Sequence, residues 1–171
     1  MPTSLFTEFN KCFFVTVSPP QNYMNYIFFL VGTFRRSKKK LNESDPLEVF
    51  WLKIEPSYIK SRRKQGYKDD RSDLTFLENQ MAYGVSIEKT KNGGEFKVTF
   101  VALSGRPLTL RVGKDGLPHC YGEANGKPCI LKEMFVNATE NFIGLPSVNY
   151  VEMKGVDEET GGNIVEKVVP K

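Results

Sequence analysis

The sequence predicts a mostly β protein, built as an antiparallel meander of hairpins with one short α-helix near residues 75–83. Two observations predict this fold class. The 171 residues include 15 Val, 7 Ile, 10 Thr and 21 aromatic residues against 4 Ala, and β-branched and aromatic side chains suit the half-buried surface of a sheet. Short apolar runs also alternate with turn residues along most of the chain. We therefore expect a single β-rich domain over residues 1–171, with its core over about residues 12–170.

The first three predicted strands cover residues 12–17, 23–31 and 47–55. The first two are joined by Ser18-Pro19-Pro20-Gln21-Asn22, and Asp45-Pro46 precedes the third. All three carry apolar side chains on both faces for most of their length, which is typical of central or covered strands.

A helix is predicted next, near residues 75–83. Thr75 and Glu78 have the spacing of a capping box, and Gly84 stands where a left-handed C-terminal cap belongs. One helical face would carry Leu74, Leu77 and Met81. A helix this short must dock on the sheet to be stable.

The rest of the chain predicts hairpins. Asn92-Gly93 and Asn125-Gly126 are strong signals for tight turns, and a longer acidic turn covers residues 157–163. The strands expected around these turns are 85–89, 95–103, 108–112, 117–124, 128–136, 148–154 and 164–169. Such spacing is typical of an antiparallel β-barrel, lipocalin-like in outline, or of a two-sheet sandwich.

The cysteine and hydropathy patterns indicate an intracellular protein, cytoplasmic or nuclear. No apolar run approaches the roughly 20 residues that a membrane-spanning helix needs. Glu8 and Asn10 interrupt the N-terminal segment where a signal peptide needs an apolar core. Three cysteines, an odd number, suit a reducing compartment.

Two of these cysteines fall on one predicted hairpin. If Asn125 and Gly126 are the central turn residues, Gly122 faces Cys129, and Cys120 lies diagonally from Cys129 on the same face. Diagonal neighbours are separated by roughly 7 Å or more, too far for ordinary disulfide geometry. We expect two free thiols.

Catalytic and metal-binding chemistry has little support. His119 is the only histidine, and Cys120 beside it points to the opposite face of a strand. No Cys-x-x-Cys pair exists to bind zinc, and no glycine pattern suits a phosphate-binding loop. We expect no cofactor, no metal site and no catalytic residues, although the 20 carboxylates leave a carboxylate-dependent enzyme as a third hypothesis.

The distribution of charge gives the one candidate site. Residues 35–68 hold 11 Lys or Arg against 4 Asp or Glu. The possible anion-binding residues form two runs that flank the strand at 47–55: Arg35, Arg36, Lys38, Lys39 and Lys40, then Lys60, Arg62, Arg63 and Lys64. These runs could contact nucleic acid or acidic lipid, or they could be solvated loops that keep the protein soluble.

Two patches of the sequence resemble a catalogued family. Leu74-Thr75 with Ala82-Tyr83-Gly84, after the strand Pro46 to Trp51, is similar to the family known as domain of unknown function 4833. The close of the chain, Val148 to Glu152, Gly155 to Asp157, Thr160-Gly161, Glu166 and Pro170, is similar as well. Residues 56–72 are longer than the connection that this resemblance implies. It supports one domain and implies no activity or site residues.

These observations favour a non-catalytic β-rich binding or interaction module. Its ligand could be a small apolar molecule in a barrel or a protein partner, although a filled core is the expected interior. The alternative hypothesis is an electrostatic binder of nucleic acid or anionic membrane through residues 35–68. The oligomeric state and the identity of the ligand are left open.

Overall fold

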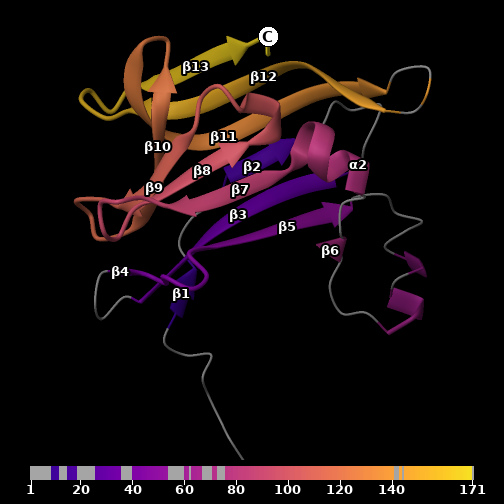
Figure 1. Cartoon of the computed structure of the whole chain (residues 1–171), viewed down its shortest axis with the longest axis horizontal. Coiled ribbons are helices and arrows are strands. Elements are labelled where there is room, and N and C mark those ends of the chain that lie inside the picture. Colours follow the sequence, from indigo (N-terminus) through magenta and orange to yellow (C-terminus); the bar gives the residue numbers. More distant parts are fainter. Residues whose placement is uncertain are drawn as a thin grey trace, which may run out of the picture.

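The protein is mostly β, as the sequence predicts. The structure, a computed structural model (Figure 1), describes residues 9–11, 15–18, 26–35, 40–53, 60–61, 63–66, 71–72, 76–140, 143 and 145–170. Its strands are β1 (Phe9–Lys11), β2 (Val15–Ser18), β3 (Tyr26–Arg35), β4 (Lys40–Leu41), β5 (Leu47–Lys53), β6 (Arg71–Ser72), β7 (Val85–Lys89), β8 (Phe96–Phe100), β9 (Leu108–Val112), β10 (Pro118–Ala124), β11 (Lys127–Glu140), β12 (Pro146–Asp157) and β13 (Asn163–Val168).

The strands form one sheet in the order β6-β5-β3-β2-β11-β10-β9-β8-β7, with β12 and then β13 on the other side of β11. The pairings among the described strands are antiparallel except that between β2 and β11, which is parallel. The sheet ends at β6 and β7, so among the described residues it is not closed into a barrel. A folded, sandwich-like sheet is the alternative that the structure supports.

Strand β11 joins the two halves of the sheet. One of its edges pairs with β12 over most of its length. The other edge pairs with β10 up to Ile130 and with β2 from Glu133. The register shifts between Leu131 and Glu133, and a bulge of this kind bends a strand and increases its twist. The bulge at Lys132 therefore marks where the sheet divides into two half-sheets, one containing β2, β3 and β5 and the other containing β7, β8, β9 and β10.

The core fills the space between the half-sheets. One apolar cluster includes Leu47 of β5, Val98 of β8, Leu110 of β9 and Met134 of β11. Burying each such side chain contributes roughly 1.5–3 kcal/mol, so packing between the halves stabilises the fold.

Both predicted hairpins are present, since β7 pairs with β8 and β10 pairs with β11. In the first, the residue with positive φ is Gly94 and not Asn92 or Gly93. Asn125 and Gly126 have φ values of 51° and 73°, as a type I′ turn requires. Ala124 pairs with Lys127, and Gly122 pairs with Cys129. The strand predicted at 95–103 is shorter, because β8 ends at Phe100 and a 3₁₀ turn, η3 (Val101–Leu103), follows.

The predicted helix is present, but its end differs from the expectation. It consists of α2 (Phe76–Glu78) and a π-helical turn, η2 (Asn79–Tyr83), and Thr75 lies outside the described residues. Gly84 is not among the residues with positive φ, so the prediction of a left-handed cap is wrong. A Cβ at Gly84 would instead overlap the carbonyl oxygen of Asn79. Glycine is needed there because the wide turn brings backbone onto backbone.

Gly84→Ala should therefore destabilise the protein. We expect a loss of about 1–3 kcal/mol in the free energy of unfolding, the usual cost of overpacking, measured by urea denaturation. Gly93→Ala is the control, because a Cβ at Gly93 meets no atom within 4 Å. Equal stability of the Gly84→Ala variant and the wild type would contradict this account of the turn.

Candidate functional site

A groove lies between the β8–β9 connection and the end of β13. It has a volume of about 470 Å³ and is lined by Ala102, Leu103, Ser104, Gly105, Arg106, Val168, Val169 and Pro170. We call it the Arg106 groove. Ala102 and Leu103 are buried, whereas Val169 is 68% exposed. The groove therefore combines buried and exposed apolar side chains with a cationic group at its boundary.

A second hollow lies on the other side of Arg106. Its volume is about 250 Å³, and it is lined by Arg106, Pro107, Leu108, Glu123 and Met153. Arg106 is the one residue that lines both hollows. Arg106 therefore borders both hollows.

Glu166 of β13 fixes the position of Arg106. Arg106 Nη1 donates to Glu166 Oε2 at 2.8 Å, and the backbone N–H of Asn125 donates to the same oxygen at 2.9 Å. The Asn125 side chain also donates to the carbonyl oxygen of Val165 at 2.9 Å. The tip of the β10–β11 hairpin is therefore tied to β13, and β13 is tied to the boundary of the groove.

This arrangement changes the pKa of Glu166. Burial by itself raises the pKa of the carboxyl, but the Asn125 N–H and the Arg106 guanidinium together lower it below its usual value of 4.5. Glu166 is thus held as a carboxylate at neutral pH.

The only histidine belongs to a separate polar cluster on the β9–β10 hairpin. His119 Nε2 lies 2.7 Å from Asp115 Oδ2. The guanidinium of Arg111 lies 3.6 Å from the ring centroid of Tyr121 and pairs with Glu158 at 3.3 Å. None of these side chains lines the Arg106 groove. Gly113 accommodates the cluster, because a Cβ there would lie 2.7 Å from the Tyr121 hydroxyl.

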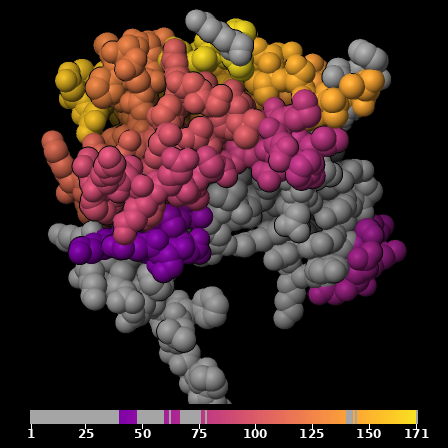
Figure 2. Space-filling view, in the orientation of Figure 1, coloured from indigo at the N-terminus to yellow at the C-terminus, as the bar shows by residue number. Residues whose placement is uncertain are grey.

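The structure separates the two basic runs. Arg35 ends β3 and pairs with Lys40, which begins β4; Arg36, Lys38 and Lys39 lie outside the described residues. Lys60, Arg63 and Lys64 are exposed in a helical segment, and Arg62 is outside the described residues. Figure 2 shows residues 40–47 and the 60–66 segment at opposite sides of the molecule. The described residues of the two runs therefore do not form one patch.

Sequence reasoning did not identify the Arg106 groove. Its walls come from residues 102–106 and 168–170, which are far apart in the chain. Arg106 also lies in an ordinary Gly-Arg-Pro turn. No local signal distinguishes it from other surface arginines, because its partner Glu166 comes from a distant strand.

The expectation of two free thiols is confirmed. Cys120 and Cys129 are both buried and free. Burial raises the pKa of Cys120 to about 12. Burial, followed by the nearby carboxylates of Glu166, Asp157 and Glu123, also raises the pKa of Cys129. Both thiols therefore stay protonated and weakly nucleophilic at neutral pH.

Comparison with known proteins gives one match. The sequence model of a family described as Domain of unknown function (DUF4833) matches residues 13–167. No curated protein and no solved structure matches the chain.

Within the described ranges, no group of three His, Cys, Asp or Glu side chains could hold a metal ion. No helix in this part of the chain has the length and hydropathy to cross a bilayer.

Glu166→Gln should remove a stabilising contribution that depends on pH. At pH 7 we expect a loss of about 1.5–3 kcal/mol, because hydrogen bonds to a charged group are weakened. The folded pKa is lowered, so the contribution is present above pH 4.5 and is lost as the pH falls through the folded value. Urea denaturation of wild type and variant from pH 7 to pH 3 measures this, with exposed Glu159→Gln as the control. A difference that does not narrow in acid would contradict the prediction.

Cys120 and Cys129 should resist alkylation in the native protein. Iodoacetamide at pH 8 should modify them only after denaturant is added, because burial blocks access and suppresses the thiolate. Peptide mass mapping distinguishes these residues from Cys12, which lies outside the described residues. Rapid labelling of Cys120 under native conditions would show that the hairpin opens or that its packing differs.

Proposed function

We propose that this chain, which belongs to the DUF4833 family, is a non-catalytic binding module whose ligand site is the Arg106 groove. The family description names no activity, so the proposal rests on geometry. The observation that carries it is the groove itself, which has largely apolar walls and is bordered by Arg106, the residue that it shares with the second hollow. Ligand sites are commonly concave and largely apolar, with a few fixed polar groups.

The dimensions of the groove favour a small ligand. Its volume of about 470 Å³ falls within the range of roughly 300–1,000 Å³ that is usual for small-molecule sites. A ligand there would contact the surface of the β-sheet, whereas the interior is occupied by the packed cluster around Leu110 and Met134. The module therefore differs from a barrel that encloses its ligand.

The polar groups favour an anionic, amphipathic ligand. Arg106 offers several N–H donors, and the described ion pair to Glu166 uses Nη1. The remaining donors can bind a carboxylate or sulfonate group. Ala102, Leu103 and Val168 would contact the apolar part of the same molecule.

The groove lining favours binding over catalysis. Among the described lining residues, Ser104 carries the one hydroxyl, and none is a His, Lys, Asp, Glu or Cys that could activate it. The described His119–Asp115 pair lies on another hairpin and contacts neither hollow. These features support a module that holds a ligand without transforming it.

Filling the groove should abolish binding of amphipathic anions. The probes are octanoate, followed by ligand-observed NMR, and anilinonaphthalene sulfonate, followed by fluorescence. Ser104→Trp places a large ring in the groove and should reduce the affinity at least tenfold. Ser86→Trp is the matched control, because Ser86 is an exposed serine on β7 outside the groove.

Three outcomes would count against the proposal. The wild type could fail to bind either probe, or Ser86→Trp could weaken binding as much as Ser104→Trp. Amide shifts on titration with octanoate could also fall outside residues 102–106 and 168–170. Turnover of a substrate that depends on His119 or Asp115 would overturn the non-catalytic part.

A further inference from the structure

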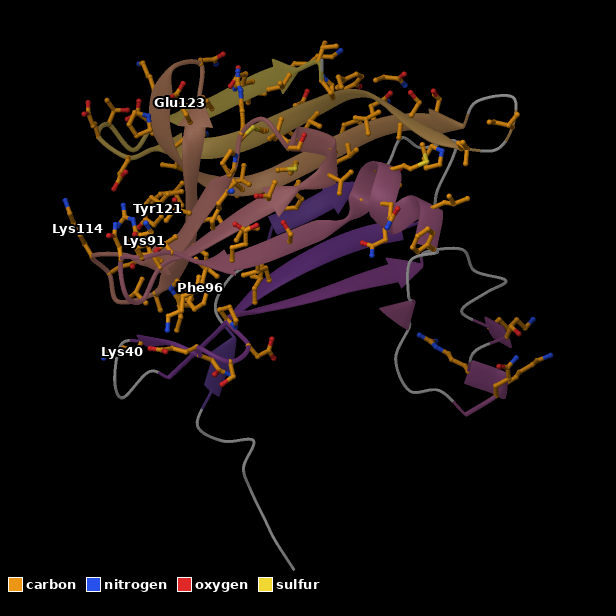
Figure 3. All side chains as sticks on the ribbon, in the orientation of Figure 1. Lys40, Lys91, Phe96, Lys114, Tyr121 and Glu123 are labelled. Carbon is orange, nitrogen blue, oxygen red and sulfur yellow. The ribbon has the colours of Figure 1, made fainter. Side chains whose placement is uncertain are left out.

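Three exposed lysines gather at one end of the molecule, and no single stretch of sequence contains them. Lys40 begins β4, Lys91 lies in the β7–β8 turn, and Lys114 lies in the β9–β10 turn. Figure 3 labels all three and shows them at the same end. We call Lys40, Lys91 and Lys114 the tip cluster.

The hairpins that carry the tip cluster are attached to one another. Lys89 Nζ, at the end of β7, donates to Glu43 Oε2 at 2.7 Å, just after β4. Strand β4 also contacts β9, and β8 pairs with β9. The relative positions of the three lysines are therefore set by the sheet.

The tip cluster has few ion-pair partners, although Lys40, after Lys89, contributes to lowering the pKa of the Glu43 carboxyl. Most nearby carboxylates have a cation or histidine of their own: Glu43 pairs with Lys89 at 2.7 Å, Glu88 with Lys97 at 3.6 Å, and Asp115 with His119 at 2.7 Å. Glu95 is the carboxylate of the β7–β8 hairpin with no described ion pair. No described ion pair involves Lys40, Lys91 or Lys114.

Lys40 also belongs to the first of the two basic runs in the sequence. Arg35 and Lys40, the first and last residues of that run, pair across β3 and β4. The sequence between them is Arg36-Ser37-Lys38-Lys39, which lies outside the described residues. Among the described residues of that run, Lys40 therefore lies at the same end as Lys91 and Lys114, which no sequence run includes.

We propose that the tip cluster binds the phosphate groups of a nucleic acid. Lysines on separate, protruding turns can each contact a different phosphate along a charged backbone. Membrane binding would be favoured by exposed apolar side chains among the lysines. In the described part of the chain, the exposed large apolar side chains are elsewhere: Phe76, Leu77, Met81, Val101, Ile143, Val165 and Val169.

The same end offers little for reading bases. Tyr121 lies there (Figure 3), but the Arg111 guanidinium covers one face of its ring at 3.6 Å. Its hydroxyl lies against Gly113. Arg111 thus occupies one face of the Tyr121 ring, so a base cannot stack on that face, and we expect the contact to depend on phosphates and not on base sequence.

The test replaces the tip cluster and compares it with an equal change of charge elsewhere. The variant K40S/K91S/K114S removes three exposed lysines, and K60S/R63S/K64S removes three cations from the opposite side of the molecule (Figure 2). Fluorescence anisotropy measures binding of a labelled short duplex at several salt concentrations. Circular dichroism and urea denaturation establish that both variants are folded.

We expect the wild type to bind the duplex with an affinity that falls steeply with salt. Each phosphate contact contributes about 0.9 to the slope of log K against log salt, so K40S/K91S/K114S should lower that slope by up to about 2.7. The control variant should leave it unchanged. Duplexes of different sequence should bind equally well.

Any of three results would overturn the proposal. One is failure of the wild type to bind the duplex at low salt. Another is an equal loss of slope in the two triple variants. The third is binding to phosphatidylserine vesicles without binding to DNA, which would assign the tip cluster to membranes. Because none of these three lysines lines the Arg106 groove, ligand binding in the groove is tested separately.

Discussion

The position of β11 between two half-sheets is the constraint on which the rest of the structure depends. One edge of β11 is shared by β10 and β2, on either side of the bulge at Lys132. Among the described strands, the parallel pairing of β2 with β11 joins the N-terminal strands to the C-terminal hairpins. The core and the Lys89–Glu43 ion pair connect them further. The bend lets Leu47 of one half pack in the same cluster as Leu110 of the other.

The two proposed binding surfaces follow from this arrangement. Strand β13 is added to the sheet through β12, and its Glu166 carboxylate holds both Arg106 and the tip of the β10–β11 hairpin. The groove therefore forms where the last strand meets the β8–β9 connection. The tip cluster forms where the β3–β4 hairpin meets two hairpins of the other half. Neither surface requires a catalytic group.

Local structure was predictable from sequence, whereas contacts between distant segments were not. The Asn125-Gly126 turn and the Cys129 register follow from the backbone preferences of two residues, and both are confirmed. The parallel pairing of β2 with β11 has no local signal. The sequence predicts Gly84 as a left-handed cap, whereas the structure requires glycine there because backbone packs against Asn79. Residue spacing alone does not distinguish a π-helical turn from the end of an α-helix. The position of Lys40, from the first basic run, at the same end as Lys91 was not predictable, because only the fold brings the two lysines to that end.

Native-state hydrogen exchange of the β11 amides tests the central role of this strand most directly. If β11 joins both halves in one cooperative core, its protected amides on the two sides of Lys132 should exchange with the same free energy, equal to that of global unfolding. The protected amides of β3 and β8 should share that value. Exchange of the β2–β3–β5 half at a clearly lower free energy than the β8–β9–β10 half would contradict this account, because the two halves would then unfold independently.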